Sequence, residues 1–97
     1  MAFAVTHFWA GGTQDQYDAI IAVVHPNGGV DPPKGQLFHA AGPCEGGYQV
    51  IAVHDSRASW ETFRDETLIP LSTGLAGGFN TPPIETDVDL HTLWIAE

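Results

Sequence analysis

The sequence predicts one small α+β domain whose elements follow the order β-α-β-β-α-β. Three observations lead to this prediction. The chain of 97 residues has room for a single domain. Its apolar residues switch between strand-like and helix-like spacing, and turns rich in glycine or proline separate the resulting segments. We therefore expect residues 1–97 to form one domain built on the split βαβ unit.

The first part of the chain predicts one strand and one helix. Residues 3–9 are mainly aromatic or β-branched and contain no breaker, which favours a strand. Thr13, followed three residues later by Gln16, is typical of a capping box at the start of a helix. Helical spacing places several large apolar side chains on one face of that helix: Tyr17, Ile20, Ile21 and Val24. Residues 25–29 then end the helix, because they contain proline and two glycines.

The middle of the chain predicts a hairpin of two strands. Residues 36–41 and 48–54 favour strands, and the glycine-rich residues 42–47 form a short turn between them. Two strands joined by so short a connection pair antiparallel.

The last part of the chain predicts a second helix and a final strand. Asp55 or Ser56 is suited to cap the helix, whose apolar face carries Trp60, Phe63 and Thr67. Pro70 should end or kink this helix, because proline lacks the backbone N–H that a helix interior needs. The final strand is expected within residues 84–95.

Right-handed crossovers give this element order a four-stranded sheet with strand order 4-1-3-2. We expect strands one and three to lie side by side and parallel. His7 and His54, each near the C-terminal end of its strand, are then neighbours. Strand four, antiparallel to strand one, brings its start, near Glu85 and Asp87, to the same edge, and we assign Asp87 to the site. The sequence thus predicts a cluster of two histidines and a carboxylate.

Composition excludes several classes of function. Lysine and arginine number 3 and aspartate and glutamate 12, a net charge of −9. A chain this acidic lacks the basic surface needed to bind nucleic acid or anionic membranes. No apolar run approaches the ~20 residues of a membrane span, and the N-terminus lacks the features of a signal peptide. Cys44 is the single cysteine, which excludes an intrachain disulfide. A cytoplasmic protein fits best.

Alternation along the strands divides the predicted sheet into two faces. One face is apolar and is expected to pack under the helices: Ala4, Thr6, Phe8, Phe38, Ala40, Ile51, Val53, Val88 and Leu90. The other face mixes apolar side chains with four histidines and two aspartates: Val5, His7, Trp9, Leu37, His39, Val50, Ala52, His54, Asp87, Asp89 and His91. We expect this second face to meet another copy of the chain.

The strand histidines are the residues best suited to chemistry. A carboxylate beside an imidazole fixes its tautomer and strengthens it as a base, so His7, His54 and Asp87 could perform general acid–base catalysis. His39 could reach a ligand. The alternatives are hydrogen bonding within a wet dimer interface, or binding of a divalent metal, for which no motif spacing is present. His25, at the end of the first helix, is explained by a cation near the helix dipole.

Four segments of the chain resemble a known superfamily: GQLFHAAG (35–42), GGYQVIAVH (46–54), DSRASWETF (55–63) and LIPL (68–71). Over residues 3–95 the chain resembles the ferredoxin-like dimeric α+β barrels, near the antibiotic biosynthesis monooxygenase-like proteins. The resemblance implies a homodimer. Members include cofactor-independent monooxygenases, lactone isomerases and haem-degrading enzymes. Their second-helix tryptophan is matched by Trp60, whereas their strand-one asparagine and second-helix histidine have no counterpart here.

The resemblance implies a small-molecule enzyme without a cofactor or metal. A histidine, His7, His54 or His39, would remove a proton from an aromatic or polyketide-like substrate. An apolar pocket would hold that substrate, and we expect Phe8, Phe38, Trp60 and Phe63 to line it. One alternative is a non-catalytic homodimer that binds a small hydrophobic ligand or supports another protein. A second is a haem- or metal-binding protein, suggested only by the number of histidines.

Overall fold

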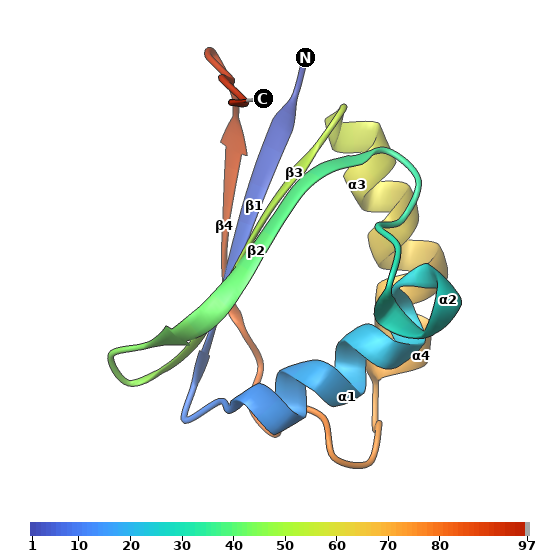
Figure 1. The fold of residues 1–97 in the computed structure, drawn as a ribbon, viewed down its shortest axis with the longest axis vertical. Helices are drawn as coiled ribbons and strands as arrows, with labels where there is room; N and C mark the ends of the chain where they lie inside the picture. The colour runs from blue at the N-terminus through green and yellow to red at the C-terminus, as the bar shows by residue number, and fades with distance from the viewer. Residues whose placement is uncertain (97) are drawn as a thin grey trace.

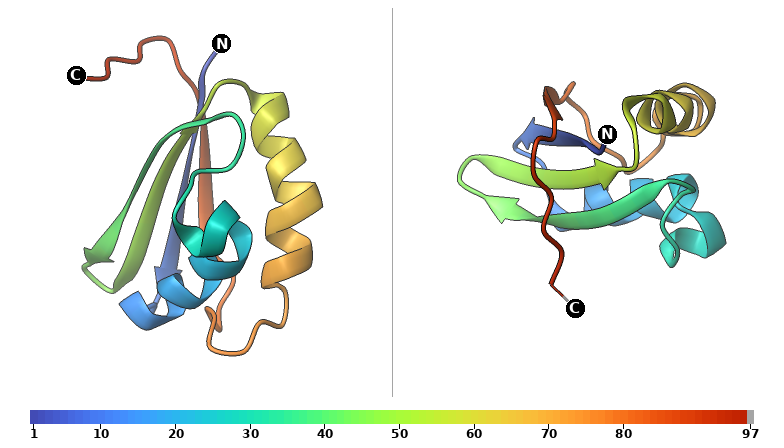
Figure 2. Two further views of the ribbon diagram at one scale, coloured as in Figure 1. Left: turned by 45° about the vertical axis from the view of Figure 1, so that its right-hand side comes forward. Right: turned by 90° about the horizontal axis from the view of Figure 1, so that it is seen from above.

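The computed structural model describes residues 1–96 and shows an α+β fold with a four-stranded antiparallel sheet. The strand order β2-β3-β1-β4 confirms the predicted order, read from the opposite edge. The elements along the chain are β1 (Phe3–Ala10), α1 (Gln14–Val24), α2 (Pro26–Gly29), β2 (Gln36–Cys44), β3 (Gly47–His54), α3 (Arg57–Phe63), the π-helical turn η1 (Arg64–Leu68), α4 (Ile69–Ser72) and β4 (Ile84–Asp89). The helices all lie on one face of the sheet, and the opposite face is uncovered (Figures 1 and 2).

The two central strands are antiparallel, so the prediction that strands one and three run parallel is wrong. The reason is the hairpin: α1 returns the chain so that β2 runs parallel to β1, and the turn into β3 then reverses direction. In the observed register His54 lies opposite Phe3, while His7 lies opposite Val50. His7 and His54 are therefore separated by four residues along β3, roughly 13 Å of strand.

The face of the sheet that carries the histidines packs under the helices, so the predicted assignment of the two faces is also wrong. The buried strand residues are Phe3, Val5, His7, Tyr48, Val50, Ala52, Val53 and His54. All of these except Val53 belong to the face opposite that of Phe8, Phe38 and Ile51, because successive side chains alternate. Phe38 and Ile51 are instead 45% and 42% exposed on the uncovered face. Both faces are rich in apolar residues, and hydropathy alone did not separate them.

Helix α1 forms as predicted. Thr13 is its N-cap, and the capping box with Gln16 is complete: each side chain accepts a hydrogen bond from the backbone N–H of the other residue. Ile20, Ile21 and Val24 pack on a core that includes Trp60 and Phe63 of α3. Burying an aromatic or large aliphatic side chain contributes about 1.5–3 kcal/mol, so this face of α1 holds the helix on the sheet.

The second helix changes to a π-helical turn shortly before Pro70 and ends two residues after it, which agrees with the prediction that Pro70 perturbs its end. Ser56 caps α3, accepting a hydrogen bond from the backbone N–H of Ser59 at 3.0 Å. The chain then widens into η1 directly before Pro70 of α4, and the helix ends at Ser72. Proline lacks an N–H and its ring collides with the carbonyl four residues earlier, so a wider turn accommodates it.

The chain beyond α4 forms a short edge strand and an extended end. β4 stops at Asp89, earlier than the predicted limit of residue 95. In the following segment Trp94 is 88% exposed. Within the described residues, no helix has both the length and the apolar character needed to cross a membrane.

Candidate functional site

A small cavity lies between the sheet and the helices. Its volume is about 50 Å³, and its surface is formed almost wholly by carbon atoms. Aliphatic side chains from both layers make the walls: Val5, Ile20, Ile21, Val24, Val50, Ala52 and Leu68. Side chains that carry polar atoms complete the lining: His7, Trp9, Tyr17, His25, Gln36, His39 and Trp60, together with the rings of Phe63 and Phe79. The cavity therefore collects most of the molecule's imidazole rings.

His7 of β1 forms one polar pair at this cavity. Its side chain is almost fully buried, and Nε2 lies 2.9 Å from Oε1 of Glu85, the residue directly opposite in β4. The ring stacks on Trp9 at 5.5 Å and contacts Trp60 at 5.4 Å between centroids. A carboxylate held against one ring nitrogen fixes the orientation and the tautomer of the imidazole, as a general base requires.

The carboxylate that contacts His7 is Glu85; the sequence placed both Glu85 and Asp87 near this edge but assigned Asp87 to the site. Asp87 lies opposite Val5, one residue pair further along the same face of β4. There it faces Arg57, with 4.0 Å between Nη1 and a carboxylate oxygen, and Arg57 also reaches Asp89 at 3.3 Å. Asp87 and Asp89 therefore serve an exposed ion-pair cluster at the sheet edge, outside the cavity.

His39 of β2 forms the second polar pair. Its Nε2 lies 2.6 Å from the hydroxyl oxygen of Tyr17 on α1. A bulge at Leu37 makes this possible: Gln36 and His39 both lie opposite inward-facing residues of β3, although they are three residues apart. Burial lowers the pKa of His39 and raises the pKa of Tyr17 to about 12, so near neutral pH both groups are uncharged.

His25 is a member of the site that the sequence did not identify. The residue is buried at the end of α1, and its ring meets that of His39 edge-on at 4.9 Å. Burial, with His39 and His54 nearby, lowers the pKa of His25 from 6.5 to about 4. The ring is therefore neutral, and the interpretation as a cation at the helix terminus is wrong. Its position directly after the apolar stripe of α1 was the signal that it faces inward.

His54 is fully buried but does not line the cavity. Its ring packs against Trp60 at 5.5 Å and Phe63 at 6.0 Å, and the Gln36 side-chain nitrogen lies 3.4 Å from Nε2. Trp60 thus contacts both His7 and His54, and the structure does not join these histidines with Asp87.

Several buried polar atoms of this region lack a hydrogen-bond partner among the described residues: Oε1 of Gln36, Nδ1 of His39, Nδ1 of His54 and Nε1 of Trp60. An unsatisfied buried polar group costs about 1–3 kcal/mol, and native proteins contain few of them. Their concentration around one cavity marks this region, rather than the sheet edge, as the candidate site.

The predicted substrate-binding residues are divided by the sheet. Trp60 and Phe63 line the cavity. Phe8 and Phe38 lie on the opposite face and do not join them there, although Phe38 borders a groove at the edge of β2. The structure therefore does not bring these four aromatic residues together, which follows from the inverted sheet faces.

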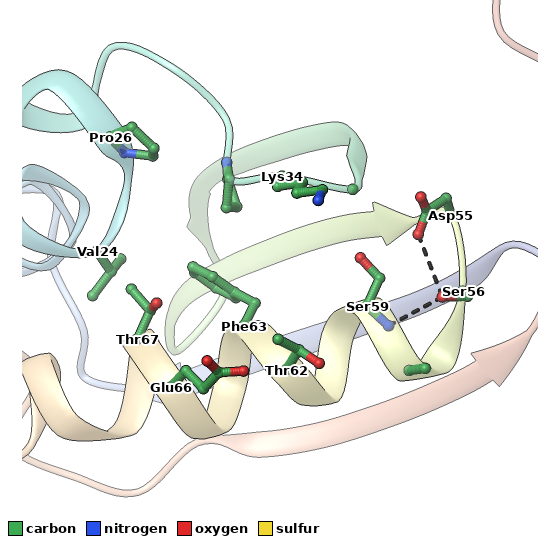
Figure 3. A pocket seen from close by; sticks show the side chains of 13 residues that line it. Val24, Pro26, Lys34, Asp55, Ser56, Ser59, Thr62, Phe63, Glu66 and Thr67 are labelled. Carbon is green, nitrogen blue, oxygen red and sulfur yellow. Dashed lines mark hydrogen bonds between the residues drawn. The ribbon is translucent and has the colours of Figure 1, made fainter.

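Two surface grooves adjoin the cavity and share walls with it. The groove in Figure 3 has a volume of about 590 Å³ and runs between α3 and the loop before β2. The Phe63 ring projects into it, and Phe63 and Val24 line both this groove and the cavity. A second groove of about 330 Å³ lies between α1, α2 and the edge of β2, and shares Tyr17 and His39 with the cavity.

The volumes limit how a substrate could bind. A cavity of about 50 Å³ is far smaller than the roughly 300–1,000 Å³ of typical small-molecule sites, so it admits only a small part of a ligand. A groove of about 330 Å³ lies in the range typical of small-molecule sites. A larger molecule must therefore occupy a groove and insert its reacting part between side chains.

Comparisons of this chain with protein-family models, with curated proteins and with solved structures find no significant match. The α+β fold with its antiparallel sheet is compatible with the ferredoxin-like class. Among residues 1–96, no group of three or more histidine, cysteine, aspartate or glutamate residues is arranged to hold a metal ion.

Proposed function

We propose that this chain is a cofactor-independent small-molecule enzyme that uses a histidine to remove a proton from its substrate, as monooxygenases and isomerases of the resembling superfamily do. One observation carries the proposal: two imidazoles, His7 and His39, line one apolar cavity, and each is held at Nε2 by its own polar partner. Two such buried polar pairs are not needed for the stability of the core, because apolar residues of similar volume would fill the same space as well.

The organic substrate would lie in the groove beside β2, with its reacting carbon inserted past Tyr17 and His39. The aromatic walls and neutral imidazoles suit an uncharged aromatic compound. After proton removal, the carbanion would react with O₂ in an oxygenase, or would take up a proton elsewhere in an isomerase. His54 is less suited as the base, because it does not line the cavity.

We further propose that the enzyme is a homodimer formed through the uncovered face of the sheet. Large apolar side chains of that face are exposed, including Phe38, Ile51, Ile84 and Val88. The accessible surface of 5978 Å² exceeds the roughly 5,400 Å² expected for a compact monomer of 10.4 kDa.

Turnover of an acidic aromatic substrate tests the enzymatic proposal. Dithranol, an anthrone with an acidic methylene group, would be supplied in air-saturated buffer and quinone formation followed by absorbance. Replacing His7 or His39 with glutamine should reduce turnover by about 10²–10⁴-fold, the usual contribution of a general base. The matched control is His91→Gln, which changes an exposed histidine after β4.

Equal turnover in the wild type and in both cavity variants would exclude a histidine base. Stable binding of aromatic compounds without any turnover would instead support the alternative, a non-catalytic dimer that binds a small hydrophobic ligand. The buried unpaired polar atoms around the cavity favour that alternative over a protein with no ligand at all.

A further inference from the structure

The two polar pairs at the cavity differ in which partner supplies the proton. Glu85, when ionised, can only accept, so Nε2 of His7 must donate at the 2.9 Å contact. A neutral His7 therefore carries its lone pair on Nδ1. The His39–Tyr17 pair has the opposite polarity, because a phenol is the stronger acid and donates its O–H to the imidazole nitrogen.

The distance between Tyr17 and His39 supports this polarity. At 2.6 Å the contact is shorter than the ~2.7–3.2 Å usual for N–H donors and lies within the range of O–H donors. The raised pKa of Tyr17, about 12, keeps its proton in place. With Nε2 of His39 accepting, the ring proton resides on Nδ1, an atom that is buried and has no partner among residues 1–96.

The strand register places these two rings across β3 from one another. His7 lies opposite Val50 and His39 opposite Ala52, with all four residues on the helix-covered face. Two strand spacings separate the flanking strands by roughly 10 Å. Both rings line the cavity, so an imidazole with its lone pair on Nδ1 and an imidazole with its proton on Nδ1 border it from two different strands.

We propose that His7 and His39 have opposite roles toward an enolisable carbonyl compound, His7 as the base at the carbon next to the carbonyl and His39 as the hydrogen-bond donor to the carbonyl oxygen. This assignment rests on the function proposed above and names its substrate class. The carbon–hydrogen bond breaks, its electron pair forms the carbon–carbon double bond, and the carbonyl π electrons move to oxygen. The proton resides on Nδ1 of His7, while Nε2 keeps its hydrogen bond to Glu85.

The size of the cavity agrees with this substrate class. The reacting group is small, since it consists of a carbon, the carbonyl carbon and its oxygen, and a cavity of about 50 Å³ admits only a small group. The rest of the molecule would remain in the adjoining groove that Tyr17 and His39 border. His39, whose pKa burial lowers, stays a neutral donor at physiological pH.

Nitrogen-15 NMR of the histidine side chains tests the assignment without any substrate. We expect His39 to be protonated at Nδ1 and His7 at Nε2, so that the two rings give opposite tautomer signatures. Tyr17→Phe should convert His39 to a mixture of tautomers and leave His7 unchanged. Glu85→Ala should do the reverse, and each variant serves as the control for the other. The same tautomer in both rings, or no response of His39 to Tyr17→Phe, would overturn the proposal.

Ligand binding supplies a second readout. α-Tetralone carries the carbonyl group, and tetralin is the matched hydrocarbon without it. The wild type should bind α-tetralone about tenfold more tightly, the contribution of one hydrogen bond, and His39→Phe should abolish the preference. Equal affinity for both compounds in the wild type would refute the donor role of His39. If the two rings show opposite tautomers and the protein prefers the ketone but catalyses no turnover, the assignment of the hydrogen-bond donors stands. That result would refute only the proposal that the protein is an enzyme.

Discussion

Acidification should destabilise this protein through His25, and replacing that residue should remove much of the effect. The folded state holds His25 neutral with a pKa of about 4, whereas the unfolded chain protonates near 6.5. Between these values the unfolded state binds more protons, so lowering the pH favours unfolding. Linkage between the two pKa values predicts a loss of about 2 kcal/mol from His25 between about pH 7 and pH 5.

Urea denaturation at these two pH values measures the effect. The free energy of unfolding of the wild type should fall by about 2 kcal/mol more than that of His25→Gln, whose side chain does not titrate. His91→Gln, at an exposed site, should behave like the wild type. The pKa values of His39 and His54 are also lowered, so these residues also make the folded state less stable at low pH. Both residues are present in the wild type and in His25→Gln, so the difference between these two proteins reports on His25. The same pH dependence in the wild type and His25→Gln would show that His25 is not held neutral by burial.

Two further predictions concern the dimer and the central strand pair. Ile51→Lys on the uncovered face should convert the dimer to a folded monomer, as measured by native mass spectrometry. Ile69→Lys, which changes a similarly exposed isoleucine of α4, should remain dimeric. A wild-type protein that is monomeric at micromolar concentration would contradict the proposed interface. Gly47→Ala should destabilise the fold by about 1–3 kcal/mol, because the added Cβ would lie 2.0 Å from the carbonyl oxygen of Trp9. Gly42→Ala is the control, since a Cβ added there meets nothing within 4 Å. Equal thermal stability of the two variants would refute the close approach at Gly47.

Local signals in the sequence predicted the elements well. The capping box at Thr13, the helical spacing that ends at Val24 and the cap at Ser56 all depend on neighbouring residues, and the structure confirms each. Strand order also followed, since crossover handedness leaves few arrangements for this element order. The predicted relative direction of strands one and three was wrong. β2 runs parallel to β1, so the hairpin that reverses the chain into β3 makes β3 antiparallel to β1 as well.

The candidate site was harder to predict, because it depends on contacts between distant segments. Alternation correctly grouped His7, His39 and His54 on one face, but it contains no information on which face the helices cover. The pairing of His7 with Glu85 rather than Asp87 follows from the β1–β4 register, which a single sequence does not specify. The contact of Tyr17 with His39 joins a helix to a bulged strand, and neither local pattern reveals it.

Hydrogen–deuterium exchange into a bound ketone tests the central claim most directly. α-Tetralone would be incubated with the protein in deuterated buffer, and the signal of the protons next to its carbonyl followed by NMR. Binding would be monitored in the same samples through the shift of the His39 ring, which the wild type and His7→Gln both contain. The account predicts that the wild type exchanges these protons faster than buffer alone and that His7→Gln binds the ketone without accelerating exchange. Exchange at the buffer rate in wild-type protein that is saturated with the ketone would contradict a proton-removing site in this cavity.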